Sequence, residues 1–446
     1  MEKTQTFYRT VMGIALPVTL QSLLQSSFSV VDQLMIGRLG SSSIAGVGLA
    51  GKFSSIYSVL LGAVAAAAGI MISQYLGQKE EKEVSRSFYA NLLLASVLAV
   101  LFMGLCLGCP EQIMWLYTKD GLTGRIAADY LRIVAFSFLP MAFTSIAATL
   151  LRCADAAMLP LYASVAAAVL NTGLNYLLIF GKLGFPELGV QGAAIATTAA
   201  QGIACLLTVF FFIRRCRRQD RKLPFIWRFD GNRGAQFLTI LCPIIVCEFL
   251  WSLGENVYTA IYGNMGTEAC AAMTLTVPVQ TLMIGALGGL SQAAAIMIGK
   301  SLGSREYDRA YRESKLLMWY GFMGSLFLSL ALLAAGRFYV GIYRVEQEVQ
   351  SLAWQLLVAF AVISPVKVQN MILGGGILRS GGKTKYVMWI DFIGTWLFGV
   401  PLGFFSAFVL KLSVPYVYFM LSLEECVRLL ISAVLFRKRS WMRSLE

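Results

Sequence analysis

Residues 62–77 read GAVAAAAGIMISQYLG, and residues 288–303 read GGLSQAAAIMIGKSLG. The two stretches lie within longer segments, residues 14–86 and 240–312, which align with each other without a gap. A unit duplicated inside one apolar chain is typical of membrane transporters, whose two halves move about a shared binding site. We therefore expect two homologous halves.

The composition indicates a membrane protein. The chain has 446 residues, of which 57% are hydrophobic and only 14% are charged, whereas about 25% of the residues of soluble proteins are charged. A helix of about 20 apolar residues crosses the ~30 Å hydrocarbon layer, and lipid excludes an open sheet because it offers no hydrogen bonds. We predict an all-α polytopic membrane protein with twelve spans: 10–36, 44–74, 87–108, 126–149, 158–180, 189–213, 235–263, 270–300, 314–335, 350–377, 385–409 and 413–436.

Two six-helix lobes follow from this pattern: an N-lobe (residues 1–213), a basic linker (214–234) and a C-lobe (235–446). Because each lobe has an even number of spans, both have the same orientation. We expect a pseudo-twofold axis along the membrane normal, with a cavity between the lobes.

The distribution of basic residues predicts the orientation. If the N-terminus is cytoplasmic, the two tails and the even-numbered loops hold most of the 37 Lys and Arg residues. This positive-inside pattern predicts an integral protein of the plasma membrane, the inner membrane in a bacterium, with both termini in the cytoplasm. We interpret the basic cluster at residues 214–222 as a topology anchor that contacts membrane lipids, and we expect no binding to nucleic acid.

The sequence does not indicate an enzyme. It contains no histidine, the usual general base and a frequent metal ligand, and its nine cysteines show no metal-binding spacing. Residues 374–384 end like a phosphate-binding loop, but Ile377 stands where the first glycine is required. We expect no cofactor, no metal and no catalytic residues, so transport would draw on an ion gradient or run downhill.

Asp32 is the leading candidate for ion coupling. Ionisable groups at membrane depth cost several kcal/mol unless they are paired, hydrated or neutralised. Gln21, Gln25, Ser29 and Asp32 form one polar stripe on an otherwise apolar helix. A buried carboxyl group there could bind and release a proton near neutral pH. The alternative is an aspartate that only links helices within the N-lobe.

Three neutral polar residues are candidate partners of Asp32. Asn171 and Asn175 lie one helical turn apart, and Thr197 in the next span could face them. Their oxygen atoms could bind Na⁺ or hold a proton-carrying network. Ordinary hydrogen bonds between helices are the alternative.

The C-lobe also carries buried ionisable candidates. Glu248 and Glu255 lie two turns apart on one helix face, and Lys367 could neutralise either of them. Glu255 could instead attract a cation. Trp251 and Tyr258 could stack on a cationic ligand, although aromatic residues at helical spacing more often pack.

Three further charged residues are expected to be structural. Glu424 and Arg428 are one turn apart and would form an intrahelical ion pair. Asp391 would have a packing role.

Several stretches together resemble multidrug and toxic compound extrusion (MATE) transporters. They are residues 15–17 (ALP) with 31–40 (VDQLMIGRLG), residues 171–181 with 189–197, the turn 378–382 (LRSGG), and residues 396–401. In this resemblance Asp32 matches the family's aspartate in helix 1 and Asn171 matches its asparagine in helix 5. Either Glu248 or Glu255 matches its glutamate in helix 7. Asn175 stands where many members have an acidic residue, and Lys367 lies at or beside a position that is aspartate in some members.

The resemblance implies export of small organic cations in exchange for H⁺ or Na⁺, by a protein that we expect to be a monomer. From these residues we favour proton coupling through Asp32. The alternative is a flippase for lipid-linked sugars or other anionic amphiphiles, for which Lys52 and Lys367 would supply the cations.

Overall fold

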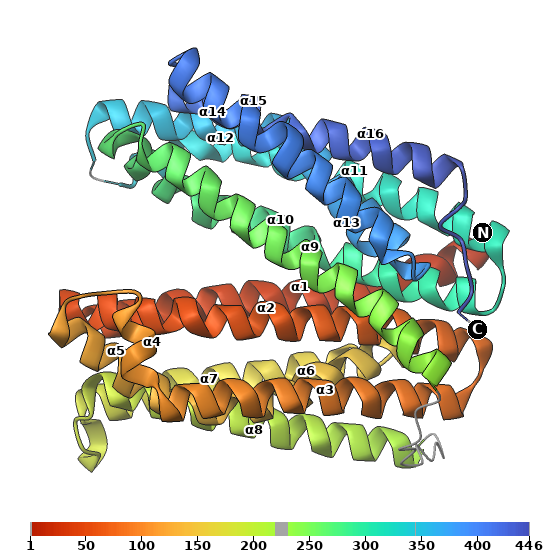
Figure 1. Ribbon diagram of the computed structural model, residues 1–446, viewed down its shortest axis with the longest axis horizontal. Coiled ribbons are helices and arrows are strands. Elements are labelled where there is room, and N and C mark those ends of the chain that lie inside the picture. The colour runs from red at the N-terminus through yellow and green to blue at the C-terminus, as the bar shows by residue number, and fades with distance from the viewer. Residues whose placement is uncertain (1, 219–230, 344, 446) are drawn as a thin grey trace. The chain divides into compact units, whose positions relative to one another are not determined.

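The computed structural model describes residues 2–218, 231–343 and 345–445, and all regular secondary structure in these ranges is helical (Figure 1). The predicted all-α polytopic fold is confirmed. The first half of the chain forms α1 Glu2–Gly37, α2 Ser41–Gln78, α3 Glu81–Gly108, α4 Pro110–Trp115, α5 Gly121–Val134, α6 Phe138–Cys153, α7 Met158–Phe180 and α8 Gly189–Arg218. Short 3-10 turns follow α5 (η1 Ala135–Ser137) and α7 (η2 Lys182–Gly184).

The second half contains long helices and several π-helical segments. Its α-helices are α9 Gly231–Gly263, α10 Thr267–Gly303, α11 Tyr307–Gly341, α12 Gln347–Asn370, α13 Thr384–Phe392, α14 Val400–Phe404, α15 Val414–Ser422 and α16 Glu424–Arg437. The π-helical segments are η3 Met371–Leu378, η4 Ile393–Gly399 and η5 Phe405–Val409. Such segments are rare and often occur at functional sites.

Eleven of the twelve predicted spans correspond, within the described residues, to helices that are long and apolar enough to cross a membrane. The predicted span 413–436 is instead divided into α15 and α16, which are separated only by Leu423. Glu424 and Glu425 begin α16, where negative charge is favourable at a helix N-terminus.

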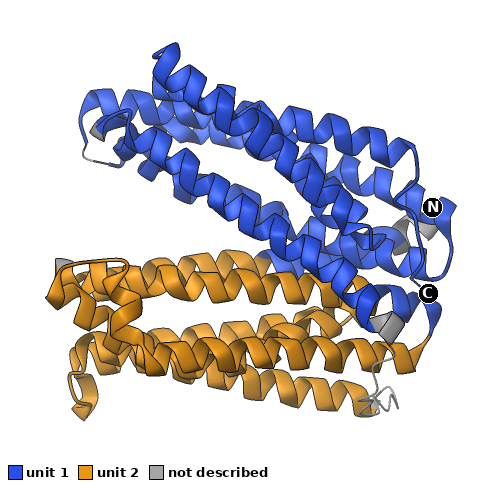
Figure 2. Ribbon diagram, in the orientation of Figure 1, with its two compact units in different colours: residues 1–19, 73–79, 230–446 blue, residues 20–72, 80–229 orange. Residues whose placement is uncertain are grey.

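The chain forms two compact units (Figure 2). Unit 1 comprises Met1–Thr19, Ser73–Lys79 and Asp230–Glu446, and unit 2 comprises Leu20–Ile72 and Glu80–Phe229. The helices α1 and α2 therefore each contribute to both units. Residues 219–230, which form most of the predicted basic linker, lie outside the described residues, and the predicted lobe boundaries stay a prediction.

Within unit 1, the ends of α2 and α10 cross at equivalent positions of the repeat. A methyl group added at Gly77 would lie 2.9 Å from the carbonyl carbon of Lys300, and one at Gly303 would lie 2.8 Å from that of Gln74. Gly77 aligns with Gly303 and Gln74 with Lys300 in the duplication, so the crossing is locally symmetric. Small residues at such crossings let helix backbones approach closely in lipid.

Candidate functional site

Asp32 lies at the centre of a hydrogen-bonded cluster in unit 2. Asn175 donates from Nδ2 to Oδ1 of Asp32 at 2.6 Å, and the same nitrogen lies 3.3 Å from Oδ1 of Asn171. When the side-chain amide of Asn171 is flipped so that its oxygen and nitrogen exchange places, the nitrogen donates to Oδ1 of Asp32 at 2.8 Å. The oxygen then accepts from the backbone nitrogen of Thr197 at 3.3 Å. The helices α1, α7 and α8 thus bring Asp32, Asn171, Asn175 and Thr197 together.

The rest of the predicted polar stripe on α1 does not join this cluster. Gln21 donates to Ser164 at 2.7 Å and accepts from Arg152 at 2.9 Å. Gln25 and Ser29 are exposed on the surface of the unit, and neither hydrogen bonds to Asp32. The helical spacing therefore placed these residues on one helix, but only Asp32 contacts Asn171 and Asn175, whereas Gln21 contacts α7 at Ser164.

Tyr130 of α5 belongs to the same region, although no sequence pattern predicted it. It interacts with Thr197 and Asp32 and packs with the apolar cluster of Ile36 and Ile179. A tyrosine in an apolar span is most often a packing residue, so only the packing of α5 against α8 shows that it borders the site.

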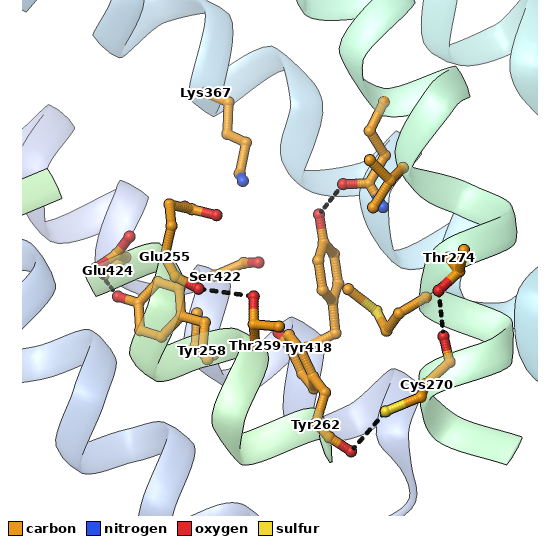
Figure 3. Close-up of a pocket in the computed structure, with 14 residues that line it drawn as sticks. Glu255, Tyr258, Thr259, Tyr262, Cys270, Thr274, Lys367, Tyr418, Ser422 and Glu424 are labelled. Carbon is orange, nitrogen blue, oxygen red and sulfur yellow. Dashed lines mark hydrogen bonds between the residues drawn. The ribbon is translucent and has the colours of Figure 1, made fainter. Parts of the chain in front are cut away.

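Unit 1 contains a cavity of about 240 Å³ lined by charged and aromatic side chains (Figure 3). Lys367 of α12 points into it toward Glu255 of α9 (Figure 3). Tyr258 Oη donates to Oε2 of Glu424 at 2.6 Å at the cavity wall. Gly399 allows this approach, because a methyl group there would collide with both Tyr258 and Glu424.

The partner of Lys367 is a residue that the sequence analysis did not single out. Its Nζ lies 4.0 Å from Oε1 of Glu425 and 5.9 Å from the ring centroid of Tyr418. Glu255 shares the cavity but lies beyond 4.0 Å from the lysine. Glu248 is bound elsewhere, because Arg379 Nη1 lies 3.0 Å from its Oε1.

The predicted ion pair between Glu424 and Arg428 is wrong. Arg428 pairs with Asp391 and, at 3.6 Å, with Glu425, whereas Glu424 turns toward Tyr258. Successive residues at the start of α16 point about 100° apart, so Glu424 and Glu425 face different neighbours. Asp391 also lies 3.9 Å from Arg379 and so connects two arginines.

Trp251 takes no part in this cavity. Its side chain is exposed on α9, while Tyr258 lies at the cavity wall. Of the two aromatic candidates, the structure brings only Tyr258 to the charged groups.

Comparison with known proteins agrees with this architecture. The MatE family model matches residues 17–177 and 243–405, and the two matches begin at positions that are equivalent in the internal duplication. The chain is 27% identical over 412 residues to a "Probable multidrug resistance protein NorM" of Rhizobium meliloti, covering 90% of this chain and 86% of the relative. It is 21% identical over 443 residues to "Uncharacterized transporter YisQ" of Bacillus subtilis, covering 97% and 95% of the two chains.

A solved structure of similar fold is the Vibrio cholerae MATE transporter VcmN in its bent form. It superposes with a TM-score of 0.89 at 18% identity and covers 99% of both chains. The predicted family resemblance is confirmed by the family match, which covers most of the chain. The chain belongs to the multidrug and toxic compound extrusion (MATE) family and is an integral membrane protein and secondary transporter, not an enzyme.

Proposed function

We propose that this transporter exports organic cations in exchange for protons and that Asp32 carries a coupling proton. The observation that supports this is the environment of Asp32, which accepts hydrogen bonds only from neutral amides. No Lys or Arg of the described residues lies within 4.0 Å of its carboxylate. An unpaired carboxylate at membrane depth is costly, so a proton or a cationic substrate would neutralise it in turn.

Competition for this carboxylate would couple the two movements. A proton arriving from outside would neutralise Asp32 and weaken the binding of the cation, which would then leave outward. Deprotonation toward the cytoplasm would restore the site by alternating access. A gradient of one pH unit supplies ~1.4 kcal/mol for each proton, enough to sustain roughly a tenfold gradient of a monovalent cation.

The first prediction is that Asp32→Asn abolishes proton-driven transport. We would measure the movement of a fluorescent monovalent cation in vesicles, with H⁺ and Na⁺ gradients imposed separately. A pH gradient should drive transport by the wild-type protein and not by Asp32→Asn, because the amide cannot exchange a proton.

The control is Asp129→Asn, which changes a half-exposed aspartate paired with Arg132. It should transport like the wild type. Full pH-driven transport by Asp32→Asn at equal expression would reject the proposal, and transport driven only by Na⁺ would assign a different coupling ion.

A flippase for anionic amphiphiles is the other candidate, but the surroundings of Lys367 do not favour it. An anionic headgroup needs uncompensated cations, and Lys367 shares its surroundings with Glu255, Glu424 and Glu425. These groups favour the binding of a cation. Competition between a lipid-linked sugar and the cationic dye would separate the two functions.

A further inference from the structure

Unit 1 contains a continuous network of ionisable side chains. Arg379 joins Glu248 at 3.0 Å and Asp391 at 3.9 Å. Arg428 pairs with Asp391 and also lies 3.6 Å from Glu425. Glu425 in turn lies 4.0 Å from Nζ of Lys367. The network therefore extends from the end of η3 to the cavity in which Lys367 lies.

The charges along this chain of contacts balance. Glu248, Asp391 and Glu425 supply three negative charges, and Arg379, Arg428 and Lys367 supply three positive charges. Each base lies within 4.0 Å of at least one of these acids. A balanced set can remain ionised in the membrane because each charge has a partner.

Two more carboxyl groups border the network, and neither has a basic partner within 4.0 Å among the residues that the structure describes. Glu255 is an exposed residue that faces the cavity, so water can solvate its charge. Glu424 is only 6% exposed, and its hydrogen-bond partner is the neutral hydroxyl group of Tyr258 at 2.6 Å. Glu424 is therefore the one group of this set that has neither a counter-ion nor bulk water.

Such a group is stable when it is protonated or when a cation enters the cavity beside it. The ionisable groups around it lie on α9, α12, α15 and its own helix α16: Glu255, Tyr258 and Tyr262 of α9, Lys367 of α12, Tyr418 of α15, and Glu425 and Arg428 of α16, with Asp391 of α13 next to Arg428. Both basic groups among them, Lys367 and Arg428, already pair with other acids.

We propose that Glu424, held by Tyr258, is a second exchangeable proton site, distinct from Asp32 and located in unit 1. This inference rests on the proposed exchange of protons for cations. It predicts the stoichiometry of the exchange: two protons, one on Asp32 and one on Glu424, for each exported cation.

The second proton changes the electrical character of transport. Exchange of one proton for one monovalent cation moves no net charge. Exchange of two protons for one monovalent cation moves one net charge, so it responds to the membrane potential as well as to the pH gradient. At 100 mV this charge corresponds to ~2.3 kcal/mol, or roughly a fifty-fold difference in the limiting cation gradient.

The test uses the full chain in vesicles, with tetraethylammonium, a cation that crosses lipid poorly by itself, as the transported cation. A K⁺ diffusion potential at equal pH should drive transport by the wild type and not by Glu424→Gln, whereas a pH gradient should drive both. The matched control is Glu313→Gln, which removes an equally buried carboxylate that is paired with Arg309 outside the cavity. It should keep the response to the potential.

The outcomes separate the inference from the function on which it rests. Transport by Glu424→Gln that still follows the potential overturns the second proton site and leaves proton exchange through Asp32 intact. If a pH gradient drives no transport by the wild type, the proposed function fails instead.

A spectroscopic measurement keeps the inference testable if Glu424→Gln does not fold. Infrared difference spectra between low and high pH report the carbonyl band of a protonated carboxyl group. In Tyr258→Phe, this band should keep its amplitude but change its frequency, because the carboxyl group remains and its hydrogen bond is lost. An identical spectrum in Tyr258→Phe and the wild type would contradict the site.

Discussion

At the scale of single residues, Asp391 shows how the charges inside unit 1 depend on one another. It accepts from Arg428 and lies 3.9 Å from Arg379, and its side chain is 13% exposed. Removal of one member of a buried ionic network is more damaging than the net contribution of the network suggests, because the remaining charges stay buried without a partner. The sequence predicts a packing role for Asp391, and the structure shows that its partners are two arginines.

We predict that Asp391→Asn lowers the free energy of unfolding by about 3–5 kcal/mol. Asp308→Asn is the matched control: Asp308 pairs with Arg439 at 3.0 Å, but its side chain is 85% exposed, so the loss should be about 0–1 kcal/mol. Thermal unfolding of both purified variants in detergent measures the difference. Equal melting temperatures would show that the network around Asp391 adds little to stability.

At the scale of helices, the duplicated segments meet each other at the α2–α10 crossing. Gly77 and Gly303 each lie against the backbone of the other helix. One turn before Gly303 on α10, a methyl group at Gly299 would lie 3.0 Å from Cβ of Ser73. Because the contacts at Gly77 and Gly303 are made by backbone atoms, neither helix can yield there by a simple side-chain rotation.

Gly303→Ala should separate α2 from α10 and lower the free energy of unfolding by about 1–3 kcal/mol, the usual cost of overpacking. Gly285→Ala is the control, since no atom lies within 4 Å of a methyl group at that helical position. That change should be neutral or stabilising by up to ~1 kcal/mol, the helix-propensity gain of alanine. Thermal unfolding measures both variants, and a stabilised Gly303→Ala protein would contradict the tight crossing.

At the scale of the whole molecule, the positions of the chain ends are consistent with the even number of predicted spans. Both termini lie at the same end of unit 1 (Figure 1). The positive-inside pattern predicts that this end is cytoplasmic. The turn around Lys182, between α7 and α8, should then be outside.

Single cysteines introduced into a cysteine-free variant would test this orientation. Lys182 and Lys438 are both exposed, so both positions can react with a maleimide that does not cross membranes. In intact cells the reagent should label Lys182→Cys and not Lys438→Cys, and it should label both after lysis. The opposite labelling pattern would reverse the predicted orientation.

The sequence alone was sufficient to predict the spans, the duplication and the family, and to identify the ionisable residues within apolar segments. These features depend on hydropathy and spacing along the chain, which are local properties. Eleven of the predicted spans are recovered for this reason, and the last one is divided at Leu423.

Only the tertiary structure decided which charges and amides pair. Arg379 and Glu248 are separated by 131 residues, and Asn175 and Asp32 by 143. The relative position and rotation of the packed helices determine which residues pair. The periodicity of polar residues along one helix does not contain this information. For the same reason Glu424 faced Tyr258 and not Arg428, which lies only one turn along its own helix.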